Sequence, residues 1–131
     1  MPHQIIHNYI DGELFAFHAK DAAQRSRILS IRPFSARAYA NDLTVRAIQL
    51  LSERPCFASL SFHIAGDGEL FDQTTRPLAG LPNVTLHKGF LTQHEIAALH
   101  RGHGVFLCPT RMDTQGVSRD EAMASGLVPV T

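Results

Sequence analysis

VFLCPTRMDTQGVSRDEAMASGLVPV, residues 105–130, contains the pattern of a strand, a loop, a helix and a second strand in that order. The apolar runs 105–108 and 127–130 are typical of short buried strands. Residues 116–124 between them have the pattern of a helix, which Gly126 ends. A helical crossover brings the chain back to the same edge of a sheet, so the two strands are expected to be parallel. The segment therefore predicts one β-α-β unit.

Three more apolar runs upstream of residue 105 predict further strands, over residues 27–31, 58–65 and 84–87. A helical pattern follows each of them, so strands and helices alternate along the chain. This alternation predicts an α/β fold, a doubly wound parallel sheet of the Rossmann-like kind with helices on both faces. Ligands of such sheets bind beyond the carboxyl ends of the strands, so the loops at those ends are the place to look for a site.

The helix after the first strand is predicted to be capped by Asn41 or Asp42 and to end before Pro55. Apolar residues recur along it at helical spacing, which supports the helix: Leu43, Ala47, Leu50 and Leu51.

The two later helices in this part of the chain have their own signals. Residues 69–75 are expected to form a short helix that Pro77 stops. Thr92 and Glu95 form a Thr-x-x-Glu capping box, which opens a helix running to about residue 101.

Length and composition suit one globular domain or a piece of a larger one, with 131 residues of which 44% are apolar and 18% charged. Residues 1–26 are predicted to be a lead-in or interdomain connector, and residues 27–131 the domain itself. Twelve basic and twelve acidic residues balance, which argues against nucleic acid as a partner. No apolar run approaches the roughly 20 residues of a membrane span, so a soluble, cytoplasmic protein is expected.

Cysteine and histidine give no recognisable metal-ligand spacing. Cys56 and Cys108 are far apart in the sequence and are expected to be reduced core residues. The eight histidines lack an acidic or thiol neighbour at a characteristic spacing, so no metal site is expected.

Two arginines follow the first predicted strand. Arg32 and Arg37 lie five residues apart in a loop and can each bind phosphate oxygens with a guanidinium fork. Solvated surface arginines are an equally good interpretation of this pair alone. The turn Gly66-Asp67-Gly68 after the second strand lets the backbone approach a ligand closely, although such turns are common wherever a strand passes into a helix.

The loop and helix start after the fourth strand combine free amides with two carboxylates. The N–H groups of Gly116, Val117 and Ser118 are expected to present the positive end of a helix to an anion. Asp113 and Glu121 lie on either side, separated by seven residues, and can accept hydrogen bonds from hydroxyl groups of one ligand. Glu121 can equally be a carboxylate that only complements the helix dipole.

This segment resembles family 4 of the retaining glycosyltransferases, the group 1 glycosyl transferases, whose GT-B fold pairs two Rossmann-like domains across a cleft. The family has an acidic residue, seven further residues and then Glu-Ala-Met-Ala-small-Gly-x-Pro-Val. Here Asp113 replaces the usual Glu, residues 121–126 match, and the proline is displaced by one residue to Pro129. The resemblance extends in order over nearly the whole chain, from residues 6–11 to the end.

The resemblance implies that the chain is the C-terminal, nucleotide-sugar-binding half of such an enzyme. Asp113 would hold hydroxyls of the donor sugar and Glu121 those of the ribose. The diphosphate would be held by Arg32, Arg37 and the amides of Gly116, Val117 and Ser118. The base would lie near Gly66 and the loop formed by Lys88, Gly89 and Phe90. No metal or other cofactor would be needed, because the guanidinium and amide donors stabilise the leaving diphosphate.

The resemblance also implies what lies outside the chain. A glycan or lipid-linked acceptor would bind through a preceding N-terminal domain, so this chain is expected to be inactive alone and prone to self-association through uncovered apolar surface. In the full-length protein, peripheral contact with a membrane is compatible with glycan biosynthesis. Two alternatives stay open: a nucleotide-sugar epimerase or phosphorylase of the same fold, and a noncatalytic α/β interaction module.

Overall fold

The computed structural model describes residues 3–4, 9–112 and 116–131. Its centre is a five-stranded parallel sheet in the order β3-β2-β1-β4-β5. The strands are β1 Arg27–Ile31, β2 Ser61–Gly66, β3 Val84–Lys88, β4 Val105–Leu107 and β5 Val128–Val130. The order reverses between β1 and β4, which makes the sheet doubly wound and confirms the predicted fold class.

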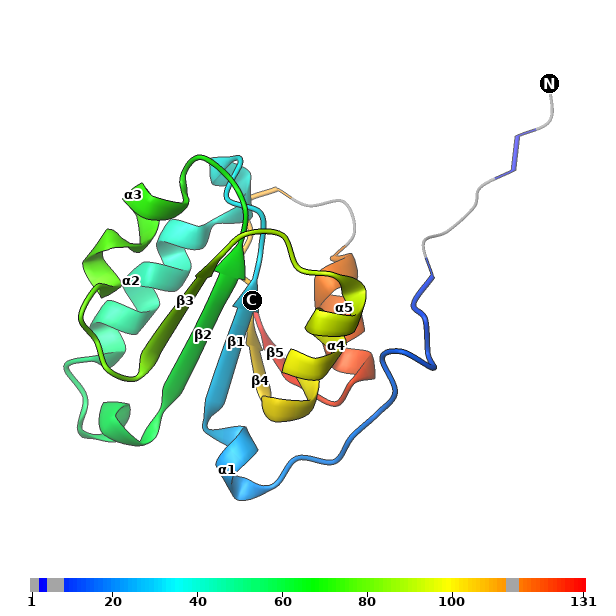
Figure 1. Ribbon diagram of the computed structural model, residues 1–131, viewed down its shortest axis with the longest axis horizontal. Helices are drawn as coiled ribbons and strands as arrows, with labels where there is room; N and C mark the ends of the chain where they lie inside the picture. Colours follow the sequence, from blue (N-terminus) through cyan, green and yellow to red (C-terminus); the bar gives the residue numbers. More distant parts are fainter. Residues whose placement is uncertain (1–2, 5–8, 113–115) are drawn as a thin grey trace.

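Helices cover both faces of the sheet, with α2 and α3 on one side and α4 and α5 on the other (Figure 1). The α-helices are α1 Ala22–Arg25, α2 Asn41–Leu51, α3 Phe71–Thr75, α4 Gln93–Gly102 and α5 Val117–Ala124. Three short 3-10 helices, η1 Arg37–Tyr39, η2 Pro55–Ser59 and η3 Arg76–Leu78, complete the connections. None of the helices in these described parts of the chain is long and apolar enough to span a bilayer.

Two separate cores follow from the alternation of side chains along the strands. On the face under α2 and α3, Phe62 and Ile64 of β2 pack in a cluster with Phe34, Val45, Ile48, Phe71 and Leu78. On the other face, Leu29 of β1 and Phe106 of β4 pack with Cys108, Ala122 and Leu127. Both faces of the central strands are thus buried, which is why these strands read as short apolar runs in the sequence.

The capping box at Thr92 is confirmed. The Thr92 hydroxyl accepts the Glu95 amide at 3.2 Å, and the Glu95 carboxylate accepts the Thr92 amide at 2.6 Å. A second box, formed by Asp21 and Gln24, opens α1 inside the segment predicted as a lead-in, so the described part of that segment contains a short helix that was not predicted.

The predicted cap of α2 is wrong. Ala40, in the left-handed region at φ 54°, precedes the helix and gives it no side-chain cap. The two candidates are engaged elsewhere, because the Asn41 amide group donates to the Pro33 carbonyl at 2.7 Å and the Asp42 carboxylate pairs with Arg111.

The apolar residues of α2 are not the ones that it buries most deeply. Leu43 and Leu50 are 43% and 49% exposed, and Ala47 and Leu51 are partly buried, with Leu51 packed against the core. The buried positions follow the i, i+3, i+4, i+7 pattern that faces a core: Asn41, Thr44, Val45 and Ile48. This stripe is not evident from the sequence because two of its four residues, Asn41 and Thr44, are polar, whereas the apolar pattern includes the more exposed leucines.

The starts of β2 and α3 differ from the prediction by two residues or more, whereas the other strands and α5 differ by one residue at most. β2 begins at Ser61 rather than residue 58, because the chain from Pro55 first forms η2, in which the Ser59 hydroxyl donates to the Cys56 carbonyl. Cys56 is consequently exposed, which corrects its predicted place in the core, whereas Cys108 is buried as expected. α3 begins two residues later than predicted, at Phe71, and continues through Pro77 as η3.

Candidate functional site

A pocket of about 260 Å³ lies at the carboxyl edge of the sheet, where the loops after β1, β2 and β3 meet the starts of α4 and α5. We call it the edge pocket. Its lining consists of Ile31, Arg32, Pro33, Gly66, Asp67, Gly89, Phe90, Leu91, Ile96 and Ser118. Five residues that the sequence singled out separately are therefore brought together here: Arg32, Gly66, Gly89, Phe90 and Ser118.

Glycine lets the loops at this edge approach one another. A Cβ built on Gly66 would lie 2.0 Å from the Arg32 carbonyl oxygen, and one on Gly68 would lie 2.2 Å from the Phe34 carbonyl carbon. The backbone is correspondingly joined across the strands, with the Phe34 amide donating to the Asp67 carbonyl at 2.7 Å. The first and second loops thus form one rigid wall of the edge pocket.

The loop after β3 is joined to the end of β2 by a backbone hydrogen bond as well. The Gly89 amide donates to the Gly66 carbonyl at 2.9 Å, directly beyond the pairing of Gly66 with Lys88. Gly89 has φ +141°, which side-chain-bearing residues rarely adopt. The turn leaves Phe90 83% exposed beside the pocket, where its ring is available to a flat ligand group.

Arg32 supplies a positive charge to the edge pocket. Only 5% of the residue is exposed, and its guanidinium carbon lies 5.4 Å from the centroid of the Tyr39 ring, within the range of a cation–π contact. Its backbone amide continues the sheet by donating to the Ala65 carbonyl at 3.2 Å. Burial and stacking hold this guanidinium in place, so it need not be ordered when a ligand arrives.

Arg37 and Lys88 are not in the lining of the edge pocket. Arg37 is exposed and lines a different groove, between α2 and α3. The Lys88 ammonium group forms an ion pair with Asp72 of α3 at 2.6 Å. The two predicted phosphate arginines therefore line different hollows, and a shared diphosphate role for both stays a prediction.

α5 begins next to the edge pocket with Gly116 as its N-terminal cap. Gly116 gives no side-chain cap, and the first intrahelical bond runs from the Asp120 amide to the Gly116 carbonyl at 2.9 Å. Helix geometry leaves the first-turn amides, including those of Val117 and Ser118, without an intrahelical acceptor. Ser118 lines the pocket, so the positive end of this helix is close to it.

The structure describes one of the two predicted carboxylates, Glu121. Glu121 lies one turn further along α5, is partly buried, and is not among the residues that line the edge pocket. Burial raises the pKa of its carboxyl group. Asp113 lies outside the described residues, so its predicted role stays a prediction.

Two ion pairs involve the loop after β4 and the start of α5, and neither was predicted from the sequence. Arg111 forks onto Asp42 at 2.6 and 2.7 Å, and its backbone amide donates to the Ala38 carbonyl at 3.0 Å. The hydrogen bonds from the Arg111 guanidinium lower the pKa of the Asp42 carboxyl group and attach the loop after β4 to the start of α2. Arg119 contacts Asp120 at 3.1 Å and lies against Gly116. No local signal marks the Arg111–Asp42 pair, because it joins residues 69 positions apart.

Comparison with known families gives one clear match. The model of the family described as "Glycosyl transferases group 1" matches residues 25–131, which is most of the chain. No curated protein matches the sequence.

Solved structures with the same fold include three that cover most of this chain. TarM has a TM-score of 0.70 and 18% identity, covering 88% of this chain and 22% of its own. The C-terminal domain of a group 1 family glycosyl transferase, LpcC, from Francisella tularensis has a TM-score of 0.67 and 15% identity, and the match covers 92% of this chain and 69% of that one. A TarM mutant from S. aureus, in complex with fondaparinux, alpha-GlcNAc-glycerol and UDP, has a TM-score of 0.66 and 19% identity. This match covers 96% of this chain and 23% of the TarM chain. At these identities the likeness shows the fold alone, and the chain spans less than a quarter of the TarM chain.

Proposed function

The chain belongs to the group 1 glycosyl transferases, and from this premise we propose that it binds the nucleotide-sugar donor of a retaining, family 4 glycosyltransferase. The observation that carries the proposal is the edge pocket, where a buried guanidinium, a helix start, two glycines and an exposed aromatic ring meet. The presence of UDP in the S. aureus TarM complex supports a nucleoside diphosphate as the ligand. A glycan or lipid-linked acceptor is proposed to bind elsewhere in the full-length protein.

The proposed division of labour follows from the chemistry of each group. Arg32 and the first-turn amides of α5 would hold the diphosphate, while Phe90 and the backbone at Gly89 would contact the base. Glu121 would accept hydrogen bonds from ribose hydroxyls. Its raised pKa fits a carboxyl group in partly desolvated surroundings, where hydroxyl donors would replace lost water. Asp113 would do the same for the sugar.

Transfer requires the bond between the anomeric carbon of the sugar and the diphosphate oxygen to break. Negative charge then grows on the diphosphate and positive charge on the sugar ring. Donors fixed at the leaving group stabilise this separated state more than the intact donor, which is the condition for catalysis. The proposed site does this with guanidinium and amide groups and uses no metal.

Titration calorimetry with UDP, GDP and ADP tests the proposal. The wild-type chain is expected to bind at least one of them, and Arg32→Ala to weaken it roughly tenfold, within the range for one charge-assisted hydrogen bond. Arg54→Ala is the matched control, because Arg54 is exposed beyond the far end of α2 and should leave affinity unchanged.

Ser118→Glu is a second test of the site that does not depend on correct folding of the Arg32→Ala variant. A carboxylate in the first turn of α5 favours the helix dipole, so the protein should unfold no more easily, yet it places negative charge beside the diphosphate. Binding that survives both Arg32→Ala and Ser118→Glu would contradict the proposed site. Absence of binding to all three nucleotides would favour a noncatalytic module.

A further inference from the structure

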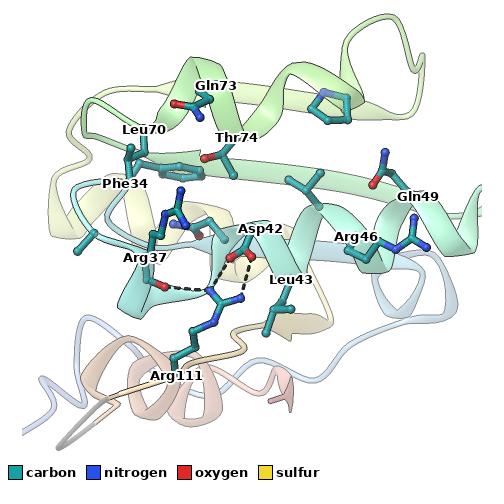
Figure 2. A pocket seen from close by; sticks show the side chains of 14 residues that line it. Phe34, Arg37, Asp42, Leu43, Arg46, Gln49, Leu70, Gln73, Thr74 and Arg111 are labelled. Atoms are coloured by element: carbon teal, nitrogen blue, oxygen red, sulfur yellow. Dashed lines mark hydrogen bonds and ion pairs between the residues drawn. The ribbon is translucent and has the colours of Figure 1, made fainter.

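A second and larger hollow lies between α2 and α3, away from the edge pocket (Figure 2). Its volume is about 740 Å³, within the range of small-molecule sites. We call it the α2–α3 groove. Its lining consists of Phe34, Ala36, Arg37, Asn41, Asp42, Leu43, Val45, Arg46, Gln49, Leu70, Gln73, Thr74, Pro77 and Arg111. It shares no lining residue with the edge pocket.

The groove has an excess of positive charge. Three arginines line it, Arg37, Arg46 and Arg111, against a single carboxylate, Asp42. Arg111 already neutralises Asp42 through two hydrogen bonds, which Figure 2 shows on the wall of the groove. Within the parts of the chain that the structure describes, no carboxylate forms an ion pair with Arg37 or Arg46. An anionic ligand would complement this charge.

A buried hydrogen-bond acceptor gives a second, independent indication. Asn41 is 6% exposed and lines the groove, and its side-chain nitrogen is committed to the Pro33 carbonyl at 2.7 Å. Its side-chain oxygen finds no hydrogen-bond donor among the described residues. Since a buried acceptor left without a donor is costly, a ligand with O–H or N–H groups would satisfy it.

The remaining lining combines neutral polar groups with apolar surface. Gln49, Gln73 and Thr74 offer amide and hydroxyl groups along the groove, as Figure 2 shows. Leu43 and Leu70 supply apolar surface. A ligand that is anionic, rich in hydroxyl groups and apolar on its ring faces matches all three features. Sugars that carry a phosphate or carboxylate have this combination.

We propose that the α2–α3 groove binds an anionic sugar, with its phosphate or carboxylate at Arg46 or Arg37 and a hydroxyl group donating to the Asn41 side-chain oxygen. This site is separate from the donor pocket and does not depend on the proposed transfer activity. Bare inorganic phosphate would satisfy the arginines but give little to Asn41, so it should bind more weakly than the sugar.

The test is protein-observed NMR titration of the full chain with glucose 6-phosphate, glucuronate, glucose and inorganic phosphate. At least one of the two anionic sugars is expected to shift the amide signals of Gln49, Gln73 and Thr74. The sugar that binds more tightly shows whether the groove prefers a phosphate or a carboxylate. Glucose or phosphate alone should bind at least tenfold more weakly. Equal affinity for inorganic phosphate, or no shift with either anionic sugar, would overturn the proposal.

Charge reversal assigns the binding to the groove. Arg46 is exposed on α2, so the fold of the Arg46→Glu variant should survive. This variant is expected to bind the anionic sugar at least tenfold more weakly, while its affinity for UDP stays unchanged. Ser118→Glu should have the opposite selectivity, so failure of one site can be told from failure of the other. Arg54→Glu is the control for net charge. Unchanged sugar binding by Arg46→Glu would refute the site.

Discussion

The stability of this protein should fall in mild acid, and His100 is the residue to test. His100 is 1% exposed and lies between two aromatic rings, with centroid distances of 5.4 Å to Phe15 and 6.1 Å to Phe106. Its Nδ1 lies 2.9 Å from the Ser125 hydroxyl oxygen, and that hydroxyl donates to the Glu121 carbonyl at 3.0 Å. Since the hydroxyl has one proton, both contacts are satisfied when Nδ1–H donates, which leaves Nε2 unprotonated and buried.

Burial, followed by the charges of Lys20 and His103, lowers the pKa of His100 from 6.5 to about 4. The unfolded chain therefore takes up the proton more readily than the folded one, and stability is lost as the pH falls below 6.5. The loss is complete below about pH 4 and amounts to about 3 kcal/mol. At pH 5.5 the pKa shift of His100 alone lowers the free energy of unfolding by roughly 1 kcal/mol. The pKa values of His63 and His103 are also lowered, mainly by burial, so both act in the same direction.

Urea unfolding at pH 7.5 and pH 5.5 measures this difference directly. The wild-type free energy of unfolding should drop between the two conditions, and His100→Leu should remove roughly 1 kcal/mol of the drop, whatever it does to the stability at pH 7.5. His94→Leu, the same substitution on the exposed side of α4, is the control and should keep the full drop. An equal pH dependence in wild type and His100→Leu would refute the reasoning.

Two further substitutions test the framework around the sites. Thr92→Ala removes the hydroxyl that caps α4 and should lower the free energy of unfolding by about 1 kcal/mol in urea; no change would contradict the capping geometry. Gly68→Ala adds a Cβ at φ +144° that would lie 2.2 Å from the Phe34 carbonyl carbon, and it should destabilise the chain by more than about 2 kcal/mol. Gly80→Ala, at φ +84° with no atom within 4 Å of the new Cβ, should cost less, and equal losses would show that the close approach is unimportant.

Strands were easier to predict from the sequence than the orientation of helices. β1 was predicted at its observed bounds because Ile28, Leu29 and Ile31 form a short apolar run, interrupted only by Ser30, that Pro33 ends. The face of α2 was missed since its core stripe contains Asn41 and Thr44, whereas Leu43 faces the α2–α3 groove. Burial of polar residues depends on partners distant in the sequence, such as Pro33 for Asn41.

The membership of the edge pocket was predictable for a topological reason. Arg32 and Gly89 directly follow β1 and β3, and Gly66 is the last residue of β2. Because these three strands are parallel neighbours, their carboxyl ends meet. The long, exposed side chains were not predictable in this way. Lys88 turns to Asp72, and Arg37 lines the other groove, because such side chains are free to reach several partners.

A crystal structure of this chain grown with UDP is the most direct measurement of the donor-site proposal. We predict that the diphosphate lies within hydrogen-bonding distance of the Arg32 guanidinium and of backbone amides at residues 116–118, with the base beside Phe90. A diphosphate bound in the α2–α3 groove, or seated where it contacts neither Arg32 nor the start of α5, would contradict the account.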